Sequence, residues 1–225
     1  MMTPTVAASR LRTRRRLGAA LWLVQPLYLV VELVAASMST APYSLLHHTI
    51  SDLGATTCTT IGYPSQDVAV CSPAHLAVNA SFVLFGVAMA VGALLLRPWL
   101  PRSRWSTAAV VLWVVAGMSS IGSGLTPLDQ LLELHAMVST PGIVLSGVAT
   151  ALTGAALLRS WAQHWWWLVL VGAINALAGA LMVVRLEVQW GGLIERIALW
   201  PSFVVCAVVA VAVLGRRSAG ALPTA

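Results

Sequence analysis

The stretch HLAVNASFVLFGVAMAVGALLL, residues 75–96, decides the class of fold. It contains no Asp, Glu, Lys or Arg, and it is as long as the roughly 20 apolar residues that a helix needs to cross the hydrocarbon core of a bilayer. Apolar and polar residues do not alternate along it, as they would in a strand of a membrane barrel. We therefore expect a membrane-spanning α-helix here.

Five further segments on either side of this one have the same character. We expect spans at 17–36, 75–96, 107–124, 135–158, 166–184 and 194–214. Over its 225 residues the chain is 59% hydrophobic and 9% charged, whereas a soluble domain carries about a quarter charged residues. This composition excludes a soluble globular enzyme, a disordered protein and a nucleic-acid-binding domain, so no nucleic acid is expected as a partner.

The predicted fold class is all-α, a six-helix transmembrane bundle. We expect an arginine-rich N-terminal tail over residues 1–16, a membrane domain over residues 17–214 and a C-terminal tail over residues 215–225. A cleaved signal peptide is an alternative for the first span. Retention of this span in the mature protein is favoured, because its apolar stretch is longer than that of a usual signal peptide and contains Pro26 and Glu32.

The basic residues predict the orientation. The formal net charge is +6, and every basic residue is an arginine. Six spans put eleven of the thirteen on one side: Arg10, Arg12, Arg14, Arg15, Arg16, Arg97, Arg102, Arg104, Arg159, Arg216 and Arg217. The positive-inside rule makes that side cytoplasmic. We expect both termini inside, a multi-pass protein of the cell membrane, and contact between these arginines and anionic lipids.

One long polar segment, about residues 38–74, joins the first two spans and is expected outside the membrane. It contains Cys58 and Cys71, for which an oxidising exterior favours a disulfide. The rival interpretation is a metal pair with histidine, but these cysteines lack the close spacing of a zinc ribbon. No HExxH motif or phosphate-binding loop is present. We expect neither a metal nor a cofactor.

The acidic residues and four of the five histidines fall on the side opposite the arginines. The acids are Glu32, Asp52, Asp67, Asp129, Glu133, Glu187 and Glu195, and the histidines are His47, His48, His75 and His135. If residues 43–54 are helical, His48 and Asp52 lie four apart on one face, where a carboxylate can orient a histidine. Gly54 would end that turn. His48, Asp52 and His135 are therefore the candidate catalytic residues, and a polar cap over the bundle is the structural alternative.

Arg196 is the basic residue that most needs a partner, because a charge near lipid is costly unless paired. Expected partners are Asp52, Asp129 or Glu133, with a phosphate headgroup as the functional alternative. The candidate ligand-binding residues are Ser51, Asn79, Asp129, Glu195 and Arg196. For Asn79, hydrogen bonding between helices is the alternative.

Small residues four apart predict where helices approach closely. One stripe, on the fourth span, is Gly142, Ser146, Thr150 and Gly154, and another, on the fifth span, is Gly172, Ala176 and Ala180. Ordinary packing within the bundle explains them, and a homo-oligomer face is the alternative.

Several short motifs resemble a known family. They are residues 48–54 (HTISDLG), Cys71-Ser72-Pro73, the span with Asn79, residues 124–127 with His135, and residues 192–197 (GLIERI). Together they resemble the bacterial and archaeal membrane family called domain of unknown function 998, from the first span to the sixth. More distantly, the turn resembles the damage-regulated autophagy modulator family. The resemblance implies a six-helix bundle without an activity, and the matching positions are Ser51, Asp52, Gly54, His135, Glu195 and Arg196.

Three functions remain open from the sequence. The first is binding of a lipid or other amphiphile from the outer leaflet, with Arg196 and the His/Asp cluster at its polar head. The second is an enzyme acting on such a lipid, with His48 or His135 as base and Asp52 orienting it. The third is a non-catalytic subunit bound to a partner membrane protein.

Overall fold

The computed structural model describes residues 4–63, 66–184 and 190–216. Its helices are α1 (Pro4–Leu23), α2 (Leu27–Met38), η1 (Ser51–Gly54), α3 (His75–Leu96), η2 (Arg97–Trp99), α4 (Arg104–Leu125), α5 (Leu132–Ser160), η3 (Gln163–Trp165), α6 (Trp166–Val184) and α7 (Gly191–Gly215). One antiparallel hairpin pairs β1 (Thr59–Gly62) with β2 (Asp67–Val70). The expected Arg217 and Glu187, and all but the first two residues of the C-terminal tail, lie outside the described residues.

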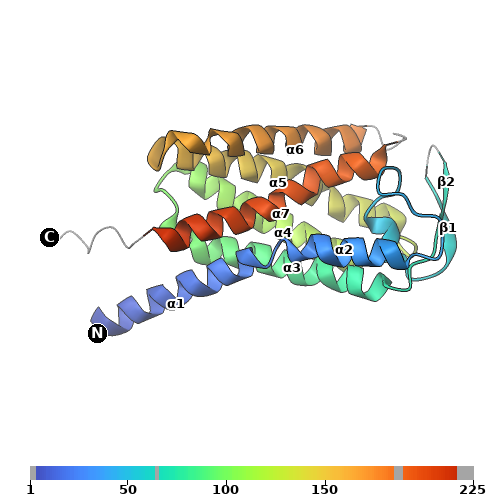
Figure 1. The fold of residues 1–225 in the computed structure, drawn as a ribbon, viewed down its shortest axis with the longest axis horizontal. Coiled ribbons are helices and arrows are strands. Elements are labelled where there is room, and N and C mark those ends of the chain that lie inside the picture. Colours follow the sequence, from blue (N-terminus) through green and yellow to red (C-terminus); the bar gives the residue numbers. More distant parts are fainter. Residues whose placement is uncertain (1–3, 64–65, 185–189, 217–225) are drawn as a thin grey trace.

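The described residues contain six helical segments long and apolar enough to cross a membrane. They are Ser9–Met38, His75–Trp99, Arg104–Leu125, Leu132–Ser160, Gln163–Val184 and Gly191–Gly215. The predicted six-helix, all-α fold is thereby confirmed, and the chain is a polytopic membrane protein. α1 begins and α7 ends at one end of the bundle, and the hairpin lies at the other (Figure 1). We call these the terminus end and the loop end.

The first span is interrupted where Pro26 follows α1. At the interruption the Gln25 backbone amide bonds to the Trp22 carbonyl instead of that of Leu21, and the Gln25 side-chain amide donates to the freed Leu21 carbonyl at 3.4 Å. The Gln25 amide donates to the Phe85 carbonyl at 3.0 Å, and the Trp22 indole donates to the Met89 carbonyl at 3.0 Å. Both donors are fully buried. The break is thus held against α3, since unpaired polar groups are costly in hydrocarbon.

The spans form a closed ring in sequence order. Each of α3, α4, α5 and α6 packs on the next, while α7 packs on α6 and returns to α1, which also packs on α3. Glycines permit close approach at several crossings. A Cβ on Gly86 would lie 2.6 Å from the Gly117 carbonyl oxygen, and one on Gly172 would collide with the Ala151 backbone nitrogen. Small residues therefore set the spacing of α3 to α4 and of α5 to α6.

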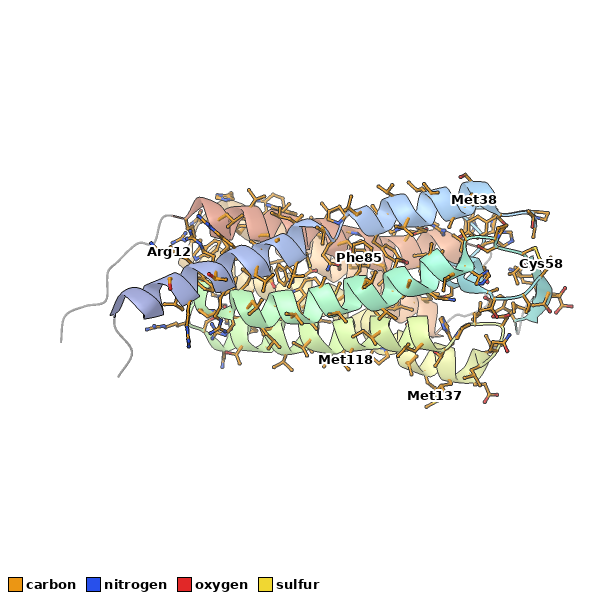
Figure 2. All side chains as sticks on the ribbon, turned by 90° about the horizontal axis from the view of Figure 1, so that it is seen from below. Arg12, Met38, Cys58, Phe85, Met118 and Met137 are labelled. Carbon is orange, nitrogen blue, oxygen red and sulfur yellow. A yellow bond between two sulfur atoms is a disulfide. The ribbon has the colours of Figure 1, made fainter. Side chains whose placement is uncertain are left out.

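The outer surface of the ring is apolar. Leu84 on α3 is 67% exposed and Leu177 on α6 is 62% exposed, while a soluble protein rarely exposes large continuous apolar patches. Figure 2 shows such side chains along the whole length of the bundle, with Arg12 at the terminus end and Cys58 at the loop end. Lipid is the environment in which this surface is stable.

The loop end carries a small folded unit. A disulfide joins Cys58 to Cys71 and so closes the hairpin, which confirms the predicted pairing. A cross-link over such a short segment contributes about 3 kcal/mol in the chain-entropy account. A small core forms beneath it from Ala55, Ile61, Val68, Val70 and Leu128. Since Leu128 belongs to the connection between α4 and α5, this core fixes the hairpin to the bundle.

The close α5–α6 contact gives a first prediction. Gly172→Ala should lower the free energy of unfolding by about 1–3 kcal/mol, because the added methyl group forces two packed backbones apart. The measurement is a denaturant titration in lipid–detergent micelles. Gly215→Ala is the matched control, since a Cβ there meets no atom of the described residues within 4 Å. Equal stability of the two variants would contradict close packing at Gly172.

Candidate functional site

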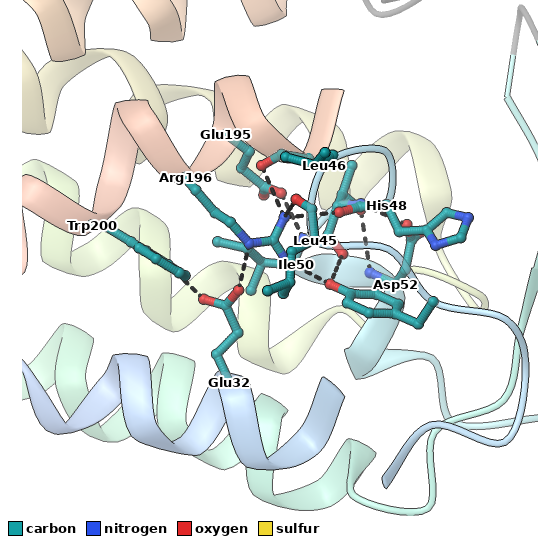
Figure 3. Close-up of polar contacts among 12 residues, drawn as sticks. Glu32, Leu45, Leu46, His48, Ile50, Asp52, Glu195, Arg196 and Trp200 are labelled. Carbon is teal, nitrogen blue, oxygen red and sulfur yellow. Dashed lines mark hydrogen bonds and ion pairs between the residues drawn. The ribbon is translucent and has the colours of Figure 1, made fainter. Parts of the chain in front are cut away.

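Arg196 lies at the centre of the polar groups at the loop end, although only 4% of it is exposed. Its Nε lies 2.9 Å from Glu32 Oε1 of α2. Glu32 Oε2 accepts a hydrogen bond of 2.8 Å from the Trp200 indole, one turn after Arg196 on α7 (Figure 3). This buried ion pair therefore joins the first span to the last.

The same guanidinium also binds the loop that follows α2. Its Nη1 donates to the carbonyl oxygens of Leu45 at 2.7 Å and His48 at 2.9 Å, and its Nη2 donates to the Tyr43 hydroxyl at 2.7 Å (Figure 3). A Cβ on Gly192 would collide with the His48 carbonyl, so glycine is required where the loop crosses α7. Arg196 thus draws residues 43–48 down onto the bundle.

The ion-pair partner of Arg196 differs from the sequence-based expectation. The structure pairs Arg196 with Glu32, so the expected partners Asp52, Asp129 and Glu133 were wrong. The physical reason is how deeply each acidic residue lies in the membrane-spanning part of the bundle. Asp52 and Asp129 have backbone donors nearby in the loops, whereas Glu32 lies within a span and needs a cation from a neighbouring helix.

Asp52 stabilises the start of η1. Its carboxylate accepts from the Thr49 amide at 2.8 Å and from the Tyr63 hydroxyl at 2.5 Å, while its own amide donates to Thr49 Oγ1 at 3.3 Å. The reciprocal bonds with Thr49 have the pattern of a capping box. Burial raises the pKa of Asp52, although these hydrogen bonds oppose the rise. Residues 43–54 do not form one helix, so the proposed face shared by His48 and Asp52 does not exist.

Two spans hold η1 from opposite sides. Glu195 Oε2 of α7 accepts a hydrogen bond of 2.6 Å from the Ile50 amide, and Asn79 of α3 donates to the Gly54 carbonyl at 2.8 Å. A Cβ on Gly54 would lie 2.5 Å from Asn79 Oδ1. The glycine that ends this turn is therefore also the point at which it contacts α3.

Asp129 anchors the other side of the loop. Its carboxylate accepts hydrogen bonds from the amides and hydroxyls of Thr56 and Thr57, at 2.9–3.0 Å, and from the Gln130 amide at 3.1 Å. Partial desolvation raises the pKa of Asp129, but these donors outweigh it, and the pKa is lowered overall. Asp129 thus fastens the segment before the hairpin to the α4–α5 connection.

Ser51 and His135 form the most chemically suggestive pair. Ser51 Oγ lies 2.8 Å from His135 Nε2, and His135 Nδ1 lies 2.6 Å from the Thr126 carbonyl oxygen. His135 is 4% exposed, in the first turn of α5. A serine hydroxyl beside a histidine whose second nitrogen is fixed is the arrangement that nucleophilic catalysis uses.

His48 belongs to a different group of contacts. Its Nδ1 accepts a hydrogen bond of 2.8 Å from the Ser44 amide, and its ring packs against Tyr43 with centroids 5.3 Å apart. The structure therefore brings Ser51 together with His135, and it puts His48 with Arg196. Catalytic roles for His48, Asp52 and His135 stay predictions, as do ligand contacts by Asn79, Asp129, Glu195 and Arg196.

A cavity of about 50 Å³ lies between the helices, below η1 and towards the loop end. Its walls come from α2, α3, α4, α5 and α7, and they include Ser51 and Glu195. Two hydroxyls in this lining, Tyr28 Oη and Ser146 Oγ, have no hydrogen-bond partner among the described residues. Tyr28 and Ser146 are 1% and 2% exposed, so the bilayer and the solvent do not satisfy them either.

A family comparison covers both the spans and the loop end. The family model described as "Protein of unknown function (DUF998)" matches residues 22–215, which include the first span from Trp22 onward, the other five spans and the whole loop end. The chain belongs to this family. No curated protein matches the chain, and no solved structure does. The likeness to the damage-regulated autophagy modulator family stays a prediction.

Sequence reasoning missed part of this site. Tyr28 belongs to no motif, Ser146 was assigned only to a packing stripe, and Thr126 was part of a motif to which no role was given. For Tyr28 and Ser146, the signal in the sequence is a hydroxyl group within an apolar span. Among the described residues, no three His, Cys, Asp or Glu side chains gather as metal ligands. The hydroxyl groups and the Glu195 carboxyl that line the cavity can donate and accept hydrogen bonds.

The ion pair gives a second prediction. Glu32→Gln should lower the free energy of unfolding by about 3–5 kcal/mol, because it leaves the Arg196 charge buried without its counter-charge. Glu133→Gln is the control, since Glu133 is exposed, and it should change stability by less than about 0.5 kcal/mol. Denaturant titration in micelles measures both. A loss for Glu32→Gln no larger than that of the control would refute a structural role for the pair.

Asp129 gives a third prediction, on pH. Its folded-state pKa is lowered, so the stability it contributes is complete above the ordinary value of 3.8 and is lost as the pH falls through the lower folded value. Hydrogen exchange of the Thr56 and Thr57 amides, followed as the pH is lowered, should report this loss. In Asp129→Asn these amides should exchange faster at neutral pH and lose the acid-dependent step. An unchanged step in that variant would assign it to another group.

Proposed function

We propose that this protein binds a membrane amphiphile whose neutral polar group enters the cavity below η1. The observation that carries the proposal is the pair of buried hydroxyls, Tyr28 Oη and Ser146 Oγ, that line the cavity without a hydrogen-bond partner among the described residues. A buried hydroxyl without a partner costs free energy. A ligand that bonds to both would recover that cost.

The size of the cavity limits which part of the ligand enters it. A volume of about 50 Å³ holds a few water-sized groups. That is enough for an ester, amide or hydroxyl group and too little for a lipid chain. The chain would remain in the bilayer, in contact with the apolar outer surface of the helices. Water molecules can occupy the same space when the ligand is absent.

Charge selects a neutral group over a phosphate. Among the described residues that line the cavity there is no arginine or histidine, and the ionisable carboxyl is that of Glu195. The Arg196 guanidinium is occupied by Glu32, Tyr43 and loop carbonyls. A phosphate would meet a carboxyl group and no available cation. Arg196 then contributes to ligand binding indirectly, because it holds the loop over the cavity.

The proposal includes an orientation in the cell membrane. The arginines at the connections of the terminus end, such as Arg97, Arg104 and Arg159, favour a cytoplasmic position for that end. The disulfide favours an oxidising side for the loop end. The cavity, which lies towards the loop end, would then take its ligand from the outer leaflet.

A photo-crosslinking experiment tests this function. The full chain is placed in phosphatidylcholine nanodiscs that contain a diacylglycerol with a diazirine next to its ester carbonyl. Mass spectrometry should find crosslinks on residues that line the cavity. The double variant Tyr28→Phe/Ser146→Ala should reduce them about 10- to 30-fold, since each lost hydrogen bond is worth about 1 kcal/mol.

The controls separate the cavity from the outer surface. Leu177, which faces outward on α6, should be labelled equally in both proteins and serves as the internal reference. Ser37→Ala removes an exposed hydroxyl of α2 and should leave labelling of the cavity unchanged. Labelling confined to outward-facing residues, or equal labelling of the cavity in the double variant, would overturn the proposal.

A further inference from the structure

We infer that Ser51 is a nucleophile and His135 its general base, and that together they cleave a carboxylic ester of a neutral membrane lipid. The inference rests on the proposed function, because the cavity would bring the ester to Ser51. Ser51 lines the cavity, and its hydroxyl is in direct contact with the imidazole.

The hydrogen-bond partners of His135 determine where its proton lies. The Thr126 carbonyl oxygen can only accept, so the Nδ1 that lies 2.6 Å from it carries the hydrogen. In the neutral ring, Nε2 then presents a lone pair, and the Ser51 hydroxyl donates to it at 2.8 Å. This is the tautomer in which a histidine can take a proton from a serine.

Both members of the pair stand on rigid supports. Ser51 begins η1, which is held by Glu195 through the Ile50 amide and by Asn79 through the Gly54 carbonyl. His135 is in the first turn of α5 and is almost fully buried. Neither side chain needs to move far for proton transfer, since the two heavy atoms are already within hydrogen-bonding distance.

The cavity provides a donor for the carbonyl oxygen of the ester. The Tyr28 hydroxyl lines the same cavity as Ser51 and has no hydrogen-bond partner among the described residues. Donors of this kind stabilise the negative charge that develops on the oxygen during acyl transfer. The described lining contains no arginine or histidine, so it favours acyl transfer from an uncharged ester over transfer of a charged phosphoryl group.

The reaction balances with water as the only co-reactant. Ser51 Oγ bonds to the ester carbonyl carbon while its proton passes to His135 Nε2. The bond from that carbon to the alkoxy oxygen then breaks, and the proton moves to this oxygen, so that an alcohol leaves. A water molecule attacks the resulting acyl-serine and gives a proton to His135, which returns it to Ser51 Oγ. A carboxylic acid is released.

The pair differs from a full triad in its third member. A backbone carbonyl, that of Thr126, orients His135 where a hydrolytic triad has a carboxylate. A carbonyl fixes the tautomer but provides less stabilisation for the imidazolium that forms. We therefore expect slow turnover, with clear reactivity of Ser51 towards reagents that trap activated serines.

The test uses the full chain in phosphatidylcholine nanodiscs and an alkyl fluorophosphonate that carries a fluorophore. The adduct should map to Ser51 by mass spectrometry, and this result does not depend on how any variant folds. Ser51→Ala should abolish the adduct, and His135→Gln should slow its formation about 100-fold or more, the typical contribution of a general base. Hydrolysis of p-nitrophenyl decanoate should fall in parallel.

Matched controls are Ser37→Ala and His164→Gln, both at exposed positions away from the cavity. They should label and hydrolyse as the wild type does, and gel filtration with thermal unfolding checks that all variants are folded. An adduct on other serines only, or equal labelling in folded His135→Gln, would overturn the inference.

Comparison with the diazirine experiment separates the two proposals. If the diacylglycerol labels the cavity but Ser51 forms no adduct and no ester is hydrolysed, the nucleophile is refuted and binding stands. If the cavity is not labelled, the binding proposal fails, and an adduct on Ser51 still supports the nucleophile.

Discussion

The pairing of Arg196 with Glu32 is the interaction on which the rest of the loop end depends. Neither charge could remain within the span region alone, because an uncompensated ion in a low-dielectric interior costs several kcal/mol. The pair links α2 to α7, and the remaining donors of the guanidinium fix residues 43–48 against the bundle. The need to pair these two buried charges therefore constrains the path of the chain after α2. The loop that leaves the membrane after α2 has to return to α7 before it can continue outward.

This path places η1 over the cavity. The loop next reaches Ile50, whose amide is fixed by Glu195, and then Ser51, which contacts His135 from α5. On the far side, Asp129 and the core under the disulfide-linked hairpin hold the loop to the α4–α5 connection. The short helix is thus held from α3, α5 and α7. Such support gives a side chain a defined position without help from a ligand, which is what a binding or reactive site requires.

The spans could be predicted because hydropathy is a local property, whereas the partners of polar residues could not. The start of the third span was expected at residue 107 and lies at Arg104, since helices continue past the apolar core into the interface. The expected stripe through Ser146 and Thr150 was only partly a packing face. Gly154 packs on α6, but closer contacts there join Gly172 to Ala151 and Gly147 to Ala176, while Ser146 lines the cavity. The Ser51–His135 contact joins residues 84 positions apart, and Glu32–Arg196 joins more distant ones still. Spacing along the chain contains no information on either.

Polar groups whose hydrogen bonds are all made within the protein stabilise the fold, whereas buried polar groups that lack a partner are available to a ligand. Arg196 and Asp129 bond to several protein groups each, and their contacts explain their presence without any other molecule. Tyr28 Oη and Ser146 Oγ bond to no group in the described part of the chain, although a phenylalanine and an alanine would fill the same space without a hydroxyl. Retaining them in a membrane interior costs more than in a soluble protein, since lipid offers no replacement donor or acceptor. The charged residues around Arg196 therefore hold the fold together. A ligand would be bound at the neutral hydroxyls beneath them, beside Ser51 and His135.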